Sequence, residues 1–298
     1  MPTKQTTNHV YGTMAIYGRF SVVVGEETQM MENYICIACG TQYPARPTAP
    51  AGCRICEDDR EAVNQQGQQW TTLAAMRAKH SNSFEQIDPG VTTICTDPSF
   101  AIGQQAHLIQ TAAGNLLWDC ISFLDDATIA EVRRRGGIAA IAISHPHFYS
   151  SMVEWSRAFD APIYLHADNR PWVMRPDQVV EFWEGGAREV LPGLTIVRCG
   201  GHFPGSSVLH WASGAGGYGA LFSGDTINVV SDRRFVSFMY SFPNLIPLNS
   251  RAVRGVVAAV DPYNFDRIYG GWSGSVVAAD AKEAVRRSAE RYIAHIQD

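Results

Sequence analysis

The chain has 298 residues, of which 46% are hydrophobic and 18% charged, and its formal net charge at pH 7 is −5. This composition is typical of a globular protein with a sizeable core, and the negative balance argues against nucleic acid as a partner. The N-terminus lacks the pattern of a signal peptide, and no apolar run is long enough to span a bilayer. We therefore expect a cytoplasmic protein that binds neither nucleic acid nor a membrane.

Four of the seven cysteines form two Cys-x-x-Cys pairs near the N-terminus. Each pair can form a tight knuckle, and two knuckles supply the four thiolates of a tetrahedral site. The pattern resembles zinc-ribbon and rubredoxin-like knuckles. We predict structural zinc rather than iron, because the loop between the pairs is short and proline-rich and nothing indicates a redox partner. The competing interpretation is four unrelated free thiols. The predicted ligands are Cys36, Cys39, Cys53 and Cys56.

The rest of the chain alternates predicted helices and strands. Apolar residues at helical spacing predict a helix over 65–80, which would bridge the N-terminal segment and the main body. Further helices are expected at 126–135, 176–183 and 279–296. Strands are expected at 91–96, 105–111, 116–120, 138–143, 162–165, 194–198, 208–211 and 220–224.

Potential metal ligands follow three of these strands. His145 and His147 come directly after the apolar run 138–143, and in an extended chain residues i and i+2 point to the same side. Both imidazoles could then face one ion, although a His-Pro-His surface loop is the competing interpretation. His202 follows the strand at 194–198, and Asp225 follows the strand at 220–224. Imidazole is a good ligand for zinc, iron and copper.

The order and spacing of four motifs resemble the metallo-β-lactamase superfamily from about residue 91 to the C-terminus. The motifs are a hairpin ending in Leu-Leu-Trp-Asp, then His-x-His, Gly-His-x-Pro-Gly-Ser and Ser-Gly-Asp-Thr. The resemblance implies an α/β fold, a four-layer αββα sandwich with a metal site at one edge between two sheets. The expected domains are a strand region with the zinc ribbon over 1–62, a helical linker over 63–87, and the metallo-β-lactamase-like domain over 88–298.

The resemblance also implies a ligand set, and this chain departs from it in one pattern. His145, His147 and His202 match the ligands of the first metal, and Asp225 matches the aspartate that bridges two metals. The ligands private to the second metal are missing, because the matching positions are occupied by Tyr149, Ser150 and, near the last of them, Trp272. We therefore predict a single ion, with Asp225 as a direct ligand or as the group that orients a bound water.

Three functions are consistent with such a site. Zinc would activate water to attack an ester, a lactone or a related carbonyl of a small-molecule substrate. Iron(II) on two histidines and Asp225 would suit an oxygenase similar to the persulfide dioxygenases of the same superfamily. The third possible function is that of a binding protein whose ion is inert. In the hydrolase, Asp225 and Tyr149 are the predicted catalytic residues. Because its phenol has an ordinary pKa of about 10, Tyr149 would donate a hydrogen bond and would not act as a base.

The predicted substrate pocket is apolar. Its walls are expected to include Phe148, Phe203 and Trp272, with Arg175 or Arg170 holding a substrate carboxylate. The aromatic-rich segment 232–247 follows Asp225. It is either a further wall of the pocket or an interface of a homodimer.

Overall fold

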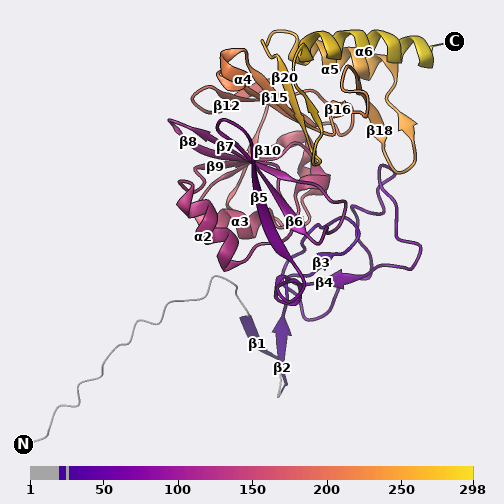
Figure 1. Ribbon diagram of the computed structural model, residues 1–298. Helices are drawn as coiled ribbons and strands as arrows, with labels where there is room; N and C mark the ends of the chain where they lie inside the picture. Colours follow the sequence, from indigo (N-terminus) through magenta and orange to yellow (C-terminus); the bar gives the residue numbers. More distant parts are fainter. Residues whose placement is uncertain (1–19, 25–26, 298) are drawn as a thin grey trace, which may run out of the picture.

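Two β-sheets packed face to face, each covered on its outer face by two helices, form the body of the protein (Figure 1). The computed structural model describes residues 20–24 and 27–297. Helices α2 (Asp126–Arg134) and α3 (Met152–Phe159) cover the first sheet, and α5 (Ser250–Val260) and α6 (Ala281–Ile296) cover the second. The layers are those of the predicted αββα sandwich, so the expected fold is confirmed.

The first sheet has seven strands in the order β11-β10-β9-β8-β7-β6-β5. Strands β5 to β8 form an antiparallel meander, whereas β8 to β11 run parallel. Helix α2 connects β8 to β9, α3 connects β9 to β10, and a short 3-10 segment connects β10 to β11. The parallel strands are short and apolar, as expected where helices cover the sheet. The bounds are β5 Ser81–Asp88, β6 Val91–Asp97, β7 Ala106–Thr111, β8 Gly114–Trp118, β9 Ala140–Ala142, β10 Ile163–His166 and β11 Val180–Trp183.

The second sheet has six strands in the order β12-β13-β14-β15-β20-β21. Strands β12 to β15 are antiparallel, and α5 returns the chain so that β20 runs parallel to β15. The bounds are β12 Ala187–Leu191, β13 Leu194–Arg198, β14 Ser207–Trp211, β15 Ala220–Gly224, β20 Arg267–Gly270 and β21 Val276–Val277. Short elements decorate the loops: η1 Pro146–Phe148, η2 Ala167–Trp172, α4 Gly214–Gly217, β16 Asn228–Val229, β17 Val236–Ser237, β18 Met239–Ser241 and β19 Ile246–Pro247.

Three apolar clusters hold the layers together. The central cluster lies between the sheets and includes Trp118, Leu209 and Phe222, none of them more than 1% exposed. The two outer clusters pack α2 and α3 on one sheet and α5 and α6 on the other. Burial of this apolar surface is the main driving force for stacking the sheets, and it fixes the strand ends where the site residues lie.

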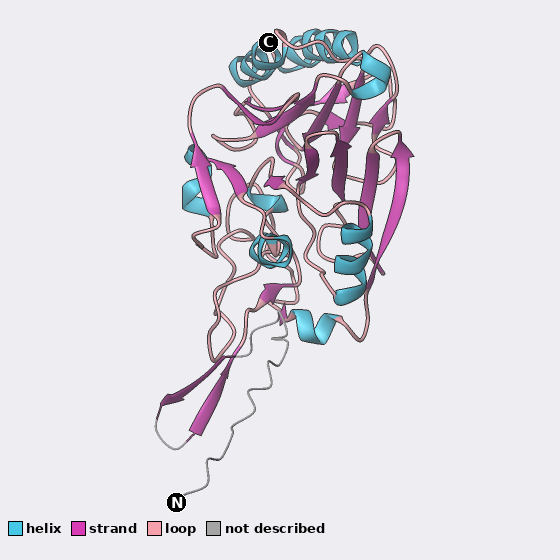
Figure 2. Cartoon of the chain, turned by 90° about the vertical axis from the view of Figure 1, so that its left-hand side faces the viewer, coloured by secondary structure: helices cyan, strands magenta, loops and turns pink. Residues whose placement is uncertain are grey.

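The N-terminal part lies at one end of the sandwich (Figure 1). Strands β1 (Phe20–Val24) and β2 (Glu27–Met31) pair antiparallel and extend away from the body (Figures 1 and 2). Residues 1–19 of the predicted strand region lie outside the described residues. Strand β3 (Ile35–Cys36) pairs with β4 (Trp70–Thr71), so that both ends of the cysteine-containing segment are tied together.

Two predicted helices are wrong. The helix expected over 65–80 is limited to α1 (Leu73–Met76), because Trp70 pairs with Cys36 in a sheet and the preceding residues form turns. The expected helical linker is therefore mostly non-helical, and its end forms β5 of the first sheet. The second wrong helix is the one expected over 176–183. Its last four residues form strand β11 instead, because their β-branched and aromatic side chains suit a strand that pairs with β10.

The helices of the body are amphipathic. The predicted helix at 279–296 corresponds to α6, which buries Ala281, Val285 and Ile293 against the sheet and carries charges on the other side. Across the described ranges, no helix combines the length and apolar character needed to cross a membrane.

Candidate metal centre

Four buried side chains meet just beyond the ends of β9, β13 and β15. They are His145, His147, His202 and Asp225, and each offers one ligand atom within 4.8 Å of the other three. Nε2 of His145 is 3.3 Å from Oδ2 of Asp225. Nε2 of His202 is 3.3 Å from Nδ1 of His147 and 3.9 Å from Oδ2 of Asp225. The structure thus brings together all four residues predicted as ligands of the active-site ion.

The two histidines of the His-x-His motif converge through a turn. His145 is extended (φ −167°), but Pro146 begins the short helix η1, which contains His147. The expectation that both histidines lie in extended chain is therefore wrong, because proline is well suited to the first position of a helical turn. The turn brings the two ring centres to 5.1 Å and presents Nε2 of His145 but Nδ1 of His147 to the site.

The strand that delivers His145 is fixed by its neighbours. The backbone N–H of Ser144 donates to Asp119 at 2.7 Å. Asp119 is buried, and burial raises the pKa of its carboxyl to about 7. Gly224 lies beside Ser144 with φ +48°, and a Cβ there would come within 2.6 Å of the Ser144 hydroxyl. Glycine before Asp225 thus allows the end of β15 to approach the histidine loop.

Hydrogen bonds on the far side of two imidazoles select the nitrogen that faces the site. Nδ1 of His202 lies 2.8 Å from the carbonyl oxygen of Tyr240, so it carries the proton and donates. Nδ1 of His145 lies 2.8 Å from the hydroxyl of Ser144. Both Nε2 atoms are then directed toward Asp225. Such bonds orient imidazole ligands in metal sites.

The residues fit a metal ion. Atoms bonded at about 2.1 Å to one tetrahedral ion lie about 3.4 Å apart, close to the spacings observed here. Nε2 of His145 and Oδ1 of Asp225 are buried without a hydrogen-bond partner, as expected of atoms that await a ligand. Burial lowers the pKa of His145 and of His202 to about 3, which keeps both imidazoles in the neutral form that binds metals. Burial also raises the pKa of Asp225 to about 6.

A fifth polar side chain, Glu61, reaches this group from the N-terminal part of the chain. Its Oε1 is 3.4 Å from Nδ1 of His147, and the side chain is 12% exposed. Glu61 lies outside the group of four whose ligand atoms are all within 4.8 Å of one another. Burial, with a smaller contribution from Asp225, raises the pKa of its carboxyl to about 7. Sequence reasoning missed Glu61, because no local spacing connects it to the histidine motifs.

The segment that carries Glu61 comprises residues 58–61, which we call the strap. Arg60 donates from Nε to the carbonyl oxygen of His202 at 2.7 Å, and its guanidinium lies 4.6 Å from the Phe203 ring centre. The Trp172 indole donates to Asp58 at 2.9 Å. On the other side, the strap binds the segment after β17 through Tyr240, Ser241 and Asn244. The strap therefore covers the histidine site.

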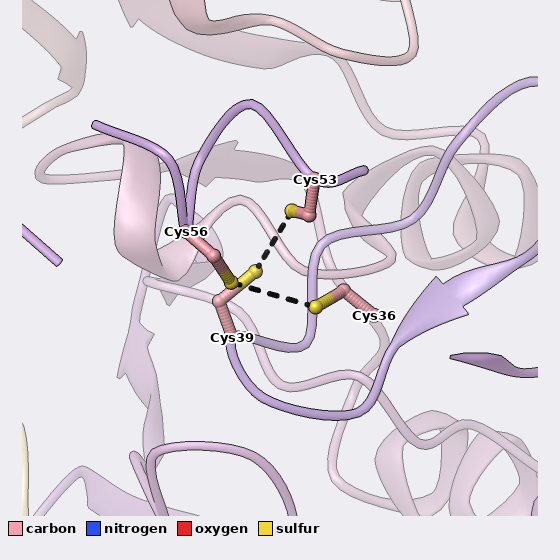
Figure 3. A group of neighbouring side chains, drawn as sticks. All are labelled: Cys36, Cys39, Cys53 and Cys56. Carbon is pink, nitrogen blue, oxygen red and sulfur yellow. Dashed lines mark hydrogen bonds between the residues drawn. The ribbon is translucent and has the colours of Figure 1, made fainter. Parts of the chain in front are cut away.

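The four predicted zinc-ribbon cysteines form a second cluster (Figure 3). Sγ of Cys36 is 3.6 Å from Sγ of Cys56, and Sγ of Cys39 is 3.6 Å from Sγ of Cys53. These distances exceed the length of a disulfide bond, about 2.05 Å, and match the edges of about 3.8 Å in a tetrahedral zinc–sulfur site. The arrangement is that of two facing knuckles and can hold a metal ion. We call residues 33–61, which contain this cluster and end in the strap, the four-cysteine unit.

A family model described as the metallo-beta-lactamase superfamily matches residues 101–272. The chain belongs to this superfamily. It is 49% identical over 265 residues to the uncharacterized protein YmaE of Bacillus subtilis (strain 168), and the match covers 88% of this chain and 96% of YmaE.

Two solved structures show the same fold. The crystal structure of VMB-1 superposes with a TM-score of 0.56 at 12% identity and covers 73% of this chain and 99% of VMB-1. The metallo-beta-lactamase FIM-1 from Pseudomonas aeruginosa, in its mono-zinc form, gives a TM-score of 0.54 at 17% identity. That match covers 72% of this chain and 97% of FIM-1.

The aromatic residues predicted to line the pocket of this superfamily member lie next to the histidines. The ring centre of Phe148 is 4.9 Å from that of His145, and the ring centre of Phe203 is 4.9 Å from that of His147. Both phenylalanines are fully buried, so they support the imidazoles from behind. Trp272 is partly buried and packs on Phe148 with ring centres 5.9 Å apart.

Tyr149 is buried directly after η1, the turn that contains His147. Its hydroxyl is buried, and the residue is one of those that line a small cavity with Gln42 and Arg175. Burial raises the pKa of the phenol well above its ordinary value, so Tyr149 is a neutral donor. In the described part of the chain no hydrogen bond or ring contact joins Tyr149 to the four ligands. Its role toward a substrate stays a prediction.

Arg175 has protein partners inside the fold. Its guanidinium is buried and donates to Glu154 on α3 at 2.5 Å and to the side-chain oxygen of Gln42 in the four-cysteine unit. A protein carboxylate thus occupies the position beside Arg175 that we predicted for a substrate carboxylate. Together with the backbone bond from Gln42 to the Ser150 carbonyl, this ion pair fastens the four-cysteine unit to the chain directly after the histidine loop.

We expect Arg175→Met to lower the free energy of unfolding by about 3–5 kcal/mol, because it leaves Glu154 buried without a counter-charge. Adding Glu154→Gln should recover part of the loss. Arg157→Met on α3 is the matched control, since its ion pair with Asp177 is half exposed and worth less than about 1 kcal/mol. Urea denaturation of the metal-loaded proteins measures the difference. If Arg175→Met and Arg157→Met lower the free energy of unfolding equally, the buried ion pair of Arg175 with Glu154 does not have the structural role described here.

Proposed function

We propose that this protein is a metal-dependent hydrolase that uses one zinc ion, held by His145, His147 and His202 beside Asp225, on an ester, a lactone or a related carbonyl substrate. The observation that carries the proposal is the buried group of three neutral imidazoles and one carboxylate with unpartnered ligand atoms. The residues beside this group support a single ion. The buried Tyr149 phenol stays neutral, and the Ser150 hydroxyl accepts a hydrogen bond from Gln104, so neither favours a second ion.

The chain's own residues fit the needs of such a reaction. Zinc on neutral ligands supplies a water whose pKa is near 7. Asp225 has one carboxylate oxygen directed at the imidazoles and a second, Oδ1, free to accept a hydrogen bond from that water. The Phe148 and Phe203 rings surround the imidazoles with apolar surface, which strengthens electrostatic interactions in the site. His202 is held by the carbonyl oxygen of Tyr240, so its ring cannot turn away.

Turnover of a small panel tests the proposal. Metal-depleted protein would be loaded with zinc or with iron(II) and assayed against aryl esters and lactones. We expect hydrolysis by the zinc-loaded protein that a chelator abolishes and added zinc restores. Hydrolysis only with iron(II), or no hydrolysis by protein shown to carry zinc at the histidine site, would overturn the proposed reaction.

A further inference from the structure

The aromatic-rich segment 232–247, which follows Asp225 in the chain, forms one side of a surface groove. The second half of α6 forms the other side and packs against β17, near the C-terminus in Figure 1. The volume of the groove is about 520 Å³, within the range of about 300–1,000 Å³ that is typical of small-molecule sites. Its apolar lining residues are Val230, Val236, Met239, Pro247, Tyr292 and Ile296. The groove is therefore large and apolar enough to hold a hydrocarbon chain.

Arg291 is a cation among the residues that line this groove. Its guanidinium lies 3.5 Å from the ring centre of Phe235, and this cation–π contact holds the side chain in place. In the parts of the chain that the structure describes, Arg291 forms neither an ion pair nor a hydrogen bond, so its N–H donors are available to a ligand. Arg287, one turn earlier on α6, donates to the carbonyl oxygen of Arg234 and has no acidic partner in the same ranges. Arg291 is thus a positioned cation that lacks an anion.

Positive charge predominates around the groove, although the chain as a whole carries a net charge of −5. Asp232, the acidic residue of segment 232–247, forms its ion pair with Arg234. Arg233 donates to the backbone carbonyl oxygens of Val230 and Gly274. A guanidinium can bind a carboxylate through two parallel N–H···O bonds. A free cation beside apolar walls therefore favours a ligand that has a carboxylate head and an apolar chain.

The groove is separate from the metal centre but borders the segment that orients one of its ligands. None of the four predicted metal ligands is among the residues that line the groove. Met239 does line it, and the carbonyl oxygens of Met239 and Tyr240 lie 3.2 and 2.8 Å from Nδ1 of His202. A ligand in the groove would therefore bind beside the support of His202 and not at the metal.

We propose that this groove binds a fatty acid, with the acyl chain between the apolar walls and the carboxylate on the Arg291 guanidinium. Burial of the chain supplies most of the binding free energy, and the charge-assisted hydrogen bonds to Arg291 fix the position of the carboxylate end. The inference goes beyond the proposed hydrolase and depends neither on the bound ion nor on the reaction.

Isothermal titration calorimetry with two probes of equal chain length tests the site. Decanoate carries the carboxylate, and decan-1-ol lacks it. We expect wild type to bind decanoate at least about 10-fold more tightly than decan-1-ol, because hydrogen bonds between charged groups are the stronger ones. Arg291→Gln should weaken decanoate binding by about 10- to 100-fold and leave decan-1-ol binding within about twofold. Equal decanoate affinities of wild type and Arg291→Gln would overturn the proposal.

Two control variants locate the bound carboxylate. Arg254→Gln changes an exposed arginine of α5 outside the groove and should bind both probes as wild type does. The His145→Ala, His202→Ala variant should bind decanoate as tightly as wild type, because its groove is intact. A large loss of decanoate affinity in that variant would place the carboxylate on the metal ion and overturn the proposal. Failure of the hydrolase assay alone leaves these affinities unchanged.

A third variant distinguishes a fatty acid from a second copy of this chain as the occupant of the groove. Ile296→Asp places a carboxylate in the groove and should weaken decanoate binding by at least about 10-fold through like-charge repulsion. Sedimentation velocity would compare the mass of this variant with that of wild type. A wild-type dimer that Ile296→Asp dissociates, together with no decanoate binding by wild type, would show that the groove is a subunit interface and overturn the proposal.

Discussion

The His145→Ala, His202→Ala variant should lose at least about 10³-fold of the hydrolytic turnover that the zinc-loaded wild type shows. Metal ions stabilise the charge that develops on a carbonyl by several kcal/mol, and each 1.4 kcal/mol is a factor of about ten in rate. Both residues present an Nε2 to the site, so the variant removes two ligands at once. The measurement is kcat/KM on whichever ester or lactone the wild type hydrolyses fastest.

The control for this loss is His295→Ala, which removes an exposed histidine from α6, far along the chain from the ligands. It should retain wild-type activity. Thermal unfolding should show that the double variant is folded, because the cores between and outside the sheets are untouched. Full activity in a folded double variant would mean that the reaction occurs elsewhere in the protein.

Removing the ion from the cysteine cluster should have the largest effect on local stability. Structural zinc sites contribute about 10–16 kcal/mol of apparent binding free energy in small peptides, and the four-cysteine unit has only a small apolar cluster of its own. We expect Cys53→Ser to release one zinc ion per chain and to expose residues 33–61 to exchange. Hydrogen exchange read by mass spectrometry would show fast exchange there and slow exchange in β6 to β9.

Cys95→Ser is the matched control, since Cys95 is a half-buried thiol that belongs to the first sheet. It should retain both the zinc and the protection of residues 33–61. If residues 33–61 of Cys53→Ser exchange as slowly as in wild type, their packing against α3 and the histidine loop is sufficient to keep them folded without metal.

Much of the fold follows from local patterns in the sequence. The order of strands and ligands gave the resemblance to the superfamily that implied the sandwich, and the Cys-x-x-Cys pairs were sufficient to predict the cysteine cluster. These predictions hold because each ligand follows an apolar strand whose end is fixed by core packing. Strand β11 was predicted as a helix, because a short parallel edge strand gains its stability from pairing with β10 and not from its own periodicity.

The site was less predictable where it depends on long-range contacts. The approach of Glu61 to His147 follows from how the strap lies on the segment after β17, and neither segment carries a motif. Arg175 lies beside a small cavity, but its partner Glu154 comes from α3 and Gln42 from the four-cysteine unit. Such pairings are set by tertiary packing and leave no periodic signal in the sequence.

Elemental analysis by inductively coupled plasma mass spectrometry tests the central claim most directly. Wild type and the His145→Ala, His202→Ala variant would be purified side by side and their metals counted. We predict about two zinc ions per chain in wild type, one at each centre, and about one in the variant. One zinc ion per chain in both proteins would mean that the histidine centre holds no metal, and the proposed hydrolase would have to be abandoned.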